Sequence, residues 1–144
     1  MNRWVIRFVF AEIVLFGCLI MAAPASAQEV SAAFTSPPGN TIGDRAGSAR
    51  STFTPTEQIV FNFVTSNAPA TTANVQIFVF DNGGKVVSVA ASANGLTTFS
   101  GNTFFNFPVN AGTVPAGNFK WLALIQYATG GLILLSPFQE LTIQ

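Results

Sequence analysis

The chain has 144 residues, with six lysines and arginines, six aspartates and glutamates, and no histidine. Charged residues make up only 8% of it, so it offers neither the cation cluster that binds nucleic acid nor the polybasic patch that binds anionic lipid. Without histidine, and with a single cysteine, it lacks both the usual general base of a hydrolytic triad and the ligands that zinc and copper prefer.

The first 27 residues have the pattern of a secretory signal peptide. Two arginines near the start precede an apolar run over residues 13–22 and an Ala-Ser-Ala segment that ends at Ala27. We expect cleavage between Ala27 and Gln28. Cleavage there would place the chain in the periplasm or outside the cell and leave it without a membrane span.

Two other interpretations of this segment stay open. Counted from Val5, its apolar stretch approaches the ~20 residues that a membrane anchor needs. Against an anchor, Glu12 would place a carboxylate in the span at a cost of roughly 2.5–3.5 kcal/mol. Residues 15–18, Leu-Phe-Gly-Cys, resemble a degenerate lipobox whose Cys18 would carry lipid. In each case Cys18 belongs to the export segment, so we expect no disulfide in the folded part.

Residues 28–144 are long enough for one domain. They carry four cations and five anions, and so few charges protect an isolated monomer poorly against association. Since disulfides cannot compensate for a small core, packing must stabilise the fold. Phenylalanine is abundant in this part, and each buried side chain contributes about 1.5–3 kcal/mol.

Residues 28–51 are expected to form a first strand, at 30–34, and a flexible loop, at 36–51. The loop contains Asp44, Arg45 and Arg50. Loops of this length are often functional or disordered. Arg45 or Arg50 could therefore bind a carboxylate or phosphate, or Asp44 could neutralise one of them on a plain surface loop.

From residue 52 onward apolar and polar residues alternate with the period of half-buried strands. Ile59, Phe61 and Phe63, for example, share one face of a predicted strand. The Gly-, Ser- and Asn-rich residues between 91 and 103 are expected to be a connection. The further runs predicted as strands are 75–80, 85–91, 103–109, 119–127, 132–135 and 138–143.

One hairpin and two edges can be placed among these strands. Asn82-Gly83 between two β-rich runs predicts a hairpin with a tight primed turn. Pro108 cannot donate to a ladder, so its strand should lie at an edge or end there. Ser136-Pro137 interrupts the last two runs, which we interpret as one kinked edge strand. About seven strands at this spacing predict an all-β fold, a two-sheet antiparallel sandwich with residues 52–144 as its core.

Three short motifs add a family resemblance over residues 52–144. They are Thr-Pro-Thr-Glu at 54–57, Phe-Asp-Asn-Gly-Gly-Lys at 80–85 and Val-Pro-Ala-Gly-Asn-Phe at 114–119. Together they resemble bacterial immunoglobulin-like domains, including the macroglobulin and fibronectin type III kinds. The last motif is similar to the Pro-x-Gly-x-Tyr corner of those families, with Phe119 in place of the tyrosine. The resemblance implies an immunoglobulin-like sandwich.

Carboxylates supply the remaining routes to catalysis or metal binding. Asp81 and Asn82 could offer oxygen ligands to calcium, but a hairpin turn explains the same residues. Paired-carboxylate hydrolysis would need two acidic residues to converge, whereas each is predicted at a strand end or turn. We therefore expect no enzyme, no metal and no cofactor. The acidic residues concerned are Glu29, Asp44, Glu57, Asp81 and Glu140.

Trp121 and Tyr127 lie on one face of the predicted strand 119–127, roughly 20 Å apart. If exposed, the two rings could form a platform for stacking a sugar. Because they share that face with Phe119 and aliphatic residues, we expect them in the core.

Two strands are apolar on both faces. Phe78 and Phe80 lie opposite an aliphatic face of 75–80, and Leu122 and Leu124 lie opposite the aromatic face of 119–127. If these strands are neighbours in one sheet, the four side chains form an exposed apolar patch, which usually marks an interaction site. The rival expectation is that the loop 36–51 or the N-terminal arm covers that patch.

The sequence therefore favours an exported, non-enzymatic module of the cell envelope or extracellular space. We expect its role to be association with a protein partner or with itself. The alternative is a module that binds carbohydrate or another small ligand through Trp121, Tyr127 or the loop arginines.

Overall fold

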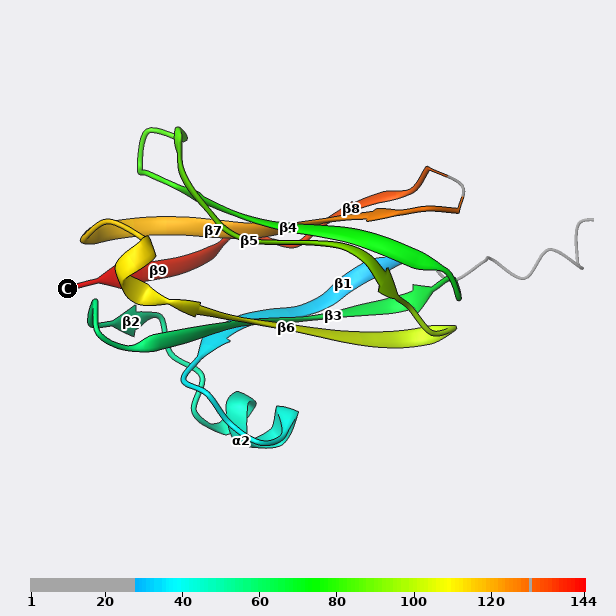
Figure 1. Ribbon diagram of the computed structural model, residues 1–144, viewed down its shortest axis with the longest axis horizontal. Helices are drawn as coiled ribbons and strands as arrows, with labels where there is room; N and C mark the ends of the chain where they lie inside the picture. The colour runs from blue at the N-terminus through cyan, green and yellow to red at the C-terminus, as the bar shows by residue number, and fades with distance from the viewer. Residues whose placement is uncertain (1–27, 130) are drawn as a thin grey trace, which may run out of the picture.

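Two β-sheets pack face to face in the computed structural model, which describes residues 28–129 and 131–144 (Figure 1). The all-β sandwich predicted from the sequence is confirmed. The predicted signal peptide, its cleavage at Ala27 and the lipid attachment at Cys18 lie outside the described residues.

The smaller sheet has the order β1-β3-β6, and the larger has the order β2-β9-β7-β4-β5 with β8 also paired to β7. Neighbouring strands are antiparallel except for β2 and β9, which are parallel. The strands are β1 (Glu29–Ser36), β2 (Thr52–Phe53), β3 (Gln58–Ala68), β4 (Thr72–Phe80), β5 (Val86–Thr97), β6 (Gly101–Asn110), β7 (Gly117–Tyr127), β8 (Ile133–Leu135) and β9 (Gln139–Ile143).

The core lies between the sheets and is built from alternate residues of each long strand, as the period-2 pattern predicts. Phe61 of β3 and Trp121 of β7 meet edge to face across it, with 4.9 Å between ring centroids. Phe63 stacks on Phe105 of the neighbouring β6 at 5.0 Å. The largest fully buried side chains are Trp121, Tyr127, Phe53, Phe61, Phe63, Ile59, Ile77, Ile125, Leu141, Ile143, Val75 and Val79.

The hairpin between β4 and β5 is confirmed, but the predicted turn type is wrong. Neither Asn82 nor Gly83 has a positive φ, and the left-handed residue is Gly84, with φ of 80°. Asp81 N–H donates to the Lys85 carbonyl at 2.9 Å, and Gly84 N–H donates to the Asp81 carbonyl at 3.0 Å. This is a three-residue loop, a turn followed by a left-handed glycine, instead of a two-residue primed turn.

Strand β5 is longer than predicted, because it continues to Thr97 through residues expected to form a connection. Its pairing with β4 shifts register in three places, and Gly95 takes a positive φ of 66°. The end of β5 is rich in Ala, Ser, Asn and Gly, which form strands poorly. Bulges accommodate these residues at a sheet edge and twist the edge away from further pairing.

Besides the 3₁₀ helix η1 (Ala111–Thr113) between β6 and β7, two short elements were not predicted. Helix α2 (Ile42–Gly47) lies inside the segment expected to be a flexible loop. A capping box starts it: Asp44 N–H donates to Thr41 Oγ1, and Thr41 N–H donates to Asp44 Oδ2, each at 3.1 Å. The second is β2, whose two residues pair with the end of β9.

One edge prediction is confirmed and the other holds only in part. Strand β6, which contains Pro108, is an outer strand of the smaller sheet. Strands β8 and β9 pair successively with the same side of β7 and are interrupted at Ser136-Pro137, as predicted. Only β8 is an edge, however, because the short strand β2 pairs with the outer side of β9.

Candidate association surface

The outer face of the larger sheet carries the four apolar residues predicted to form a patch. Strands β4 and β7 are direct neighbours, with Phe78 opposite Leu122 and Gln76 opposite Leu124. The alternating residues of both strands, such as Ile77 and Trp121, point into the core. The two strands are therefore neighbours in one sheet, as the predicted apolar patch requires.

Aromatic rings gather at one part of this face. The centroids of Phe78 and Phe80 are 6.4 Å apart, and Phe80 meets Phe138 edge to face at 5.6 Å. Phe138 comes from the break between β8 and β9 and is 57% exposed. Leu122, by contrast, is only 8% exposed, so the patch has a packed base and an accessible aromatic rim.

Register extends the patch across the neighbouring strands. Residues directly opposite each other in a sheet point to the same face. Val89 of β5 is opposite Phe78 and Val86 is opposite Phe80. Leu135 of β8 is opposite Leu124, and Ile133 of the same strand is opposite Gln126 on the same outer face.

The concentration on one face is marked. Among the described residues, the exposed large hydrophobic side chains are seven, of which five belong to this face and two, Ile42 and Phe99, lie elsewhere. We call the following set the apolar face: Phe78, Phe80, Val86, Val89, Leu122, Leu124, Ile133, Leu135 and Phe138.

Charge is almost absent here. Within the strands of the larger sheet the charged residues are Lys120 of β7 and Glu140 of β9, which lie opposite each other. Lys120 Nζ is 3.8 Å from Glu140 Oε1, and both side chains are more than half exposed. One ion pair without net charge therefore borders the apolar face.

The segment expected as a rival cover packs on the opposite side of the molecule. Helix α2 and its flanking turns lie against the outer face of the smaller sheet (Figure 1). Arg45 reaches β3 there, with Nε donating to Asn62 Oδ1 at 2.9 Å. The expectation that the loop 36–51 covers the apolar face is therefore wrong, and β1 of the N-terminal arm belongs to the smaller sheet.

Arg45, a candidate binding residue, is only 9% exposed and is used within the fold. A second hydrogen bond runs from its Nη1 to the Gly39 carbonyl at 2.6 Å, and its guanidinium lies 5.3 Å from the centroid of the Phe104 ring. Asn62, fully buried, also donates to Ser36 Oγ at 3.0 Å. These contacts fix the loop to the sheet, so Arg45 does not present a free cation to solvent.

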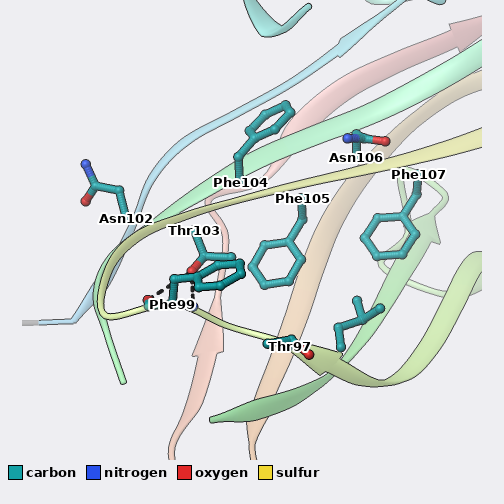
Figure 2. A pocket seen from close by; sticks show the side chains of 9 residues that line it. Thr97, Phe99, Asn102, Thr103, Phe104, Phe105, Asn106 and Phe107 are labelled. Carbon is teal, nitrogen blue, oxygen red and sulfur yellow. Dashed lines mark hydrogen bonds between the residues drawn. The ribbon is translucent and has the colours of Figure 1, made fainter. Parts of the chain in front are cut away.

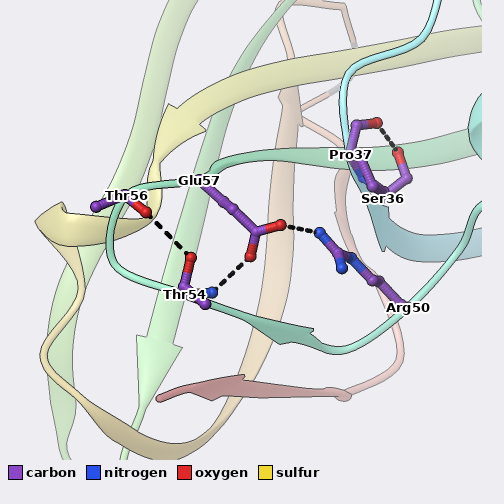
Figure 3. Close-up of polar contacts among 6 residues, drawn as sticks. All are labelled: Ser36, Pro37, Arg50, Thr54, Thr56 and Glu57. Atoms are coloured by element: carbon purple, nitrogen blue, oxygen red, sulfur yellow. Dashed lines mark hydrogen bonds and ion pairs between the residues drawn. The ribbon is translucent and has the colours of Figure 1, made fainter.

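Arg50, the other loop arginine, pairs with Glu57 and not with Asp44 (Figure 3). Its guanidinium also lies 4.7 Å from the centroid of the Phe53 ring. Glu57 Oε2 accepts a hydrogen bond from the Thr54 N–H at 2.6 Å. That backbone hydrogen bond and the Arg50 guanidinium lower the pKa of Glu57 below its ordinary value.

Trp121 and Tyr127 are in the core, as expected, because the two residues are 0% and 1% exposed. Neither ring can stack a sugar from these positions. In the described part of the chain, Trp121 Nε1 and the Tyr127 hydroxyl are buried without a hydrogen-bond partner.

One hollow along the side of the sandwich, about 390 Å³, is lined by residues from the end of β5, the following turn and β6. Figure 2 shows the rings of Phe99, Phe105 and Phe107 along it, and Phe99 is 68% exposed. A second hollow of about 300 Å³ lies between Phe34 and Glu140 on the opposite side, with Arg50 in its wall.

Three of the acidic residues, Asp44, Glu57 and Asp81, accept hydrogen bonds within local turns or caps. Asp81 Oδ1 accepts hydrogen bonds from the Gly83 and Lys85 N–H groups at 2.9 Å. These contacts agree with the interpretation of Asp81 and Asn82 as hairpin-turn residues. The described residues contain no group of three His, Cys, Asp or Glu side chains that could hold a metal ion. Within the same residues, no helix is long and apolar enough to cross a membrane.

The chain matches no protein-family model and none of the curated proteins.

Proposed function

We propose that this protein is an exported, non-enzymatic module that associates with a protein partner through the apolar face. The supporting observation is that five of the seven exposed large hydrophobic side chains of the described residues lie on this one side. Monomers rarely expose contiguous apolar patches larger than a few hundred Å², and such patches are often functional.

The anatomy of this surface is also that of an interface. Its centre is aromatic and aliphatic, and its charged pair lies at one end. Protein interfaces likewise have a core depleted of charge and enriched in aromatic residues, surrounded by a polar rim. The signal-peptide pattern of residues 1–27 supports export, and the missing histidine supports a role without catalysis.

We further infer that the sandwich is of the immunoglobulin-like kind. The order β1-β3-β6 corresponds to strands A-B-E, and the order β9-β7-β4-β5 corresponds to strands G-F-C-C′. The corner before β7 supports the same assignment: Gly117 has φ of 142°, and a Cβ there would meet the Phe119 ring at 3.2 Å. Phe119 thus packs at this corner without the hydroxyl that a tyrosine would supply.

The alternative, binding of carbohydrate or another small ligand, now depends on the hollow beside β6. Three aromatic rings line it, and one of them, Phe99, is largely exposed (Figure 2). Calorimetric titration with polysaccharide fragments tests this alternative, and heat of binding that disappears in Phe99→Ala would support it. Equal heats in the two proteins would remove it.

The association proposal is tested with the processed protein, its N-terminus established by sequencing. Light scattering should give a mass above the monomer that rises with concentration, and an apolar dye should fluoresce on binding. Phe138→Ser and Leu135→Ser should reduce both signals. Phe99→Ser is the matched control, because it removes an equally exposed apolar side chain outside the apolar face.

A protein that stays monomeric at high concentration and binds no apolar dye would contradict the proposal. A monomer that binds the dye, and loses it in Phe138→Ser, would instead have a free face for a different protein.

A further inference from the structure

Strand β5, at the edge of the larger sheet, has no counterpart across the sandwich in the described part of the chain. On the other side β1 contacts β8 and β9, and in the middle Phe61 of β3 meets Trp121 of β7. In the same order β6 falls opposite β4, whose inward residues are at most 1% exposed. No residue of β5, by contrast, is buried. The smaller sheet is therefore one strand short beneath β5.

The outer edge of β6 carries backbone groups that face away from the sheet. Ala111 N–H donates to the Glu57 carbonyl at 2.9 Å, and the register of β6 with β3 places these two residues opposite each other. Along an antiparallel ladder, successive residues direct N–H and C=O alternately toward and away from the neighbour. The odd-numbered residues of β6 therefore face β3, whereas Phe104 and Asn106 direct both groups outward. Among the described strands β3 is the one neighbour of β6.

The usual protection of a sheet edge is missing along most of β6. Pro108 occupies an outward position, so its ring removes no bond to β3. Residues 101–107 before it contain neither a charge nor a proline, and from Thr103 onward the pairing with β3 has no shift. Charges, prolines and bulges are the devices that keep a further strand from pairing with an edge. The edge of β6 before Pro108 is therefore open to such a strand.

The hollow of about 390 Å³ lies where a strand next to β6 would run. One wall includes every residue from Asn102 to Phe107. Since successive residues belong to opposite faces of a sheet, this wall is the edge of the strand and not one of its faces. Leu96, Thr97 and Phe99 form the other wall, and no lining residue is charged (Figure 2). A strand placed here would cover Phe99, which is 68% exposed.

The space accepts a single extended segment more readily than a second copy of the sandwich. Antiparallel pairing of two β6 edges would bring the uncovered β5 of each copy over β6 of the other. That layer is already filled by β4 and β5 of the larger sheet. An isolated segment has no second layer and avoids this overlap.

We propose that the edge of β6 binds an extended, uncharged segment of a partner protein as a fourth strand of the smaller sheet. The N–H and C=O groups of Phe104 and Asn106 supply the backbone hydrogen bonds. Apolar side chains at alternate positions of the segment enter the hollow and give selectivity, as in other cases of strand addition. In the immunoglobulin-like assignment proposed above, this is the position of strand D beside strand E. The site is separate from the apolar face and goes beyond the proposed function.

Synthetic peptides of seven residues, with threonine alternating with valine, leucine or phenylalanine and a lysine at each end, are the probe. Nuclear magnetic resonance of the processed protein should show saturable binding of at least one of them. The amides of Phe104 and Asn106 should then become protected from hydrogen exchange. Those of Thr103 and Phe105 should be protected already in the free protein, because they face β3.

Asn106→Pro tests the role of the outward edge. It removes one outward N–H without touching the ladder to β3, and should weaken peptide binding by about fivefold or more. Asn106→Thr is the matched control: it changes the same exposed side chain but keeps the N–H, so binding should stay within about twofold. Far-ultraviolet dichroism checks that both variants fold.

A peptide methylated at the backbone nitrogens that face β6 gives a test on the unaltered protein. It keeps the apolar side chains but lacks the donors, so it should not bind. Phe138→Ser, on the apolar face, should leave peptide binding unchanged.

Four results would overturn the proposal: no binding of any of the three peptides at millimolar concentration, equal binding by Asn106→Pro, equal binding of the methylated peptide, or loss of binding in Phe138→Ser. The last result would place the peptide on the apolar face and leave the proposed function standing. Association lost in Phe138→Ser together with peptide binding that persists would support both proposals as separate sites.

Discussion

Arg45 Nε donates a hydrogen bond to Asn62 Oδ1 at 2.9 Å. This contact lies on the outer face of the smaller sheet, which is covered, unlike the outer face of the larger sheet. It holds the segment around α2 on the smaller sheet, where Phe104 lies under the guanidinium. The larger sheet has no equivalent cover in the described part of the chain, and its outer side is the apolar face. The buried arginine is therefore one of the contacts that keep the smaller sheet covered.

Replacing this arginine should destabilise the fold strongly. Arg45→Ala removes the hydrogen bonds to Asn62 and Gly39 and leaves a fully buried amide oxygen without its donor. A loss of this kind costs about 2–4 kcal/mol in the free energy of unfolding. Arg45→Lys should not restore it, because an ammonium lacks the planar fork that reaches both acceptors.

Urea denaturation monitored by tryptophan fluorescence measures this loss. Arg50→Ala is the comparison, since Arg50 is an exposed arginine of the same loop with an ion pair, and exposed pairs contribute little. Equal destabilisation by the two variants would mean that the Arg45 network does not hold the loop.

Sequence reasoning identified the sandwich because alternation in β3, β4 and β7 is strong enough to assign each residue to a face. It failed where local preference and pairing disagree. The Ala-, Ser- and Gly-rich end of β5 has weak strand preference, yet β4 holds it as an edge. Helix α2 is six residues long, too short for a helical period to show, although the Thr41-x-x-Asp44 spacing was a readable capping signal.

The apolar face was predictable only in part. Phe78, Phe80, Leu122 and Leu124 are visible as apolar residues on the second face of a strand. Their meeting depends on the pairing of β4 with β7, which are more than 30 positions apart in sequence, and periodicity gives no strand neighbours. Phe138 was predicted as the first residue of the strand 138–143 and lies just before β9 in the structure. Periodicity does not show that it contacts Phe80.

Removing the Tyr127 hydroxyl should not destabilise the protein. A buried hydroxyl without a partner has given up its hydration with no compensating hydrogen bond. Tyr127→Phe should therefore leave the free energy of unfolding unchanged or raise it by up to about 1 kcal/mol. Trp121→Phe differs, because it also leaves a void beside Phe61 and should lower stability by about 1–3 kcal/mol.

Thermal and urea denaturation of both variants check this contrast. A clear loss of stability in Tyr127→Phe would show that its hydroxyl has a structural partner in solution.

Acid should weaken the turn that precedes β3 through Glu57. Its pKa is lowered by the Thr54 N–H and by Arg50, so folding favours the ionised form. The stabilisation is therefore complete above the ordinary pKa of 4.5 and is lost as the pH falls below it, through the depressed folded-state pKa. Glu57→Gln should lack this part of the pH dependence.

The measurement is the urea midpoint of the two proteins between neutral and strongly acidic pH. The difference in urea midpoint between the original protein and Glu57→Gln should shrink as the pH falls below the ordinary carboxyl pKa. In Arg50→Ala the urea midpoint should depend less steeply on pH over this range. A constant difference between original and Glu57→Gln across that range would contradict the assignment.

The turn between β4 and β5 offers a comparison of two adjacent glycines. Gly84 has φ of 80° and open space around its Cα, so Gly84→Ala forces a side chain into a left-handed conformation at a cost of about 1–2 kcal/mol. Gly83 has no such φ, and an added Cβ would meet only Asp81 Oδ1 at 3.2 Å. Gly83→Ala should therefore cost less, and Gly84→Asn should recover part of the loss because asparagine tolerates this conformation. A primed two-residue turn at Asn82-Gly83 would reverse the order, so denaturation midpoints of the three variants distinguish the two turns.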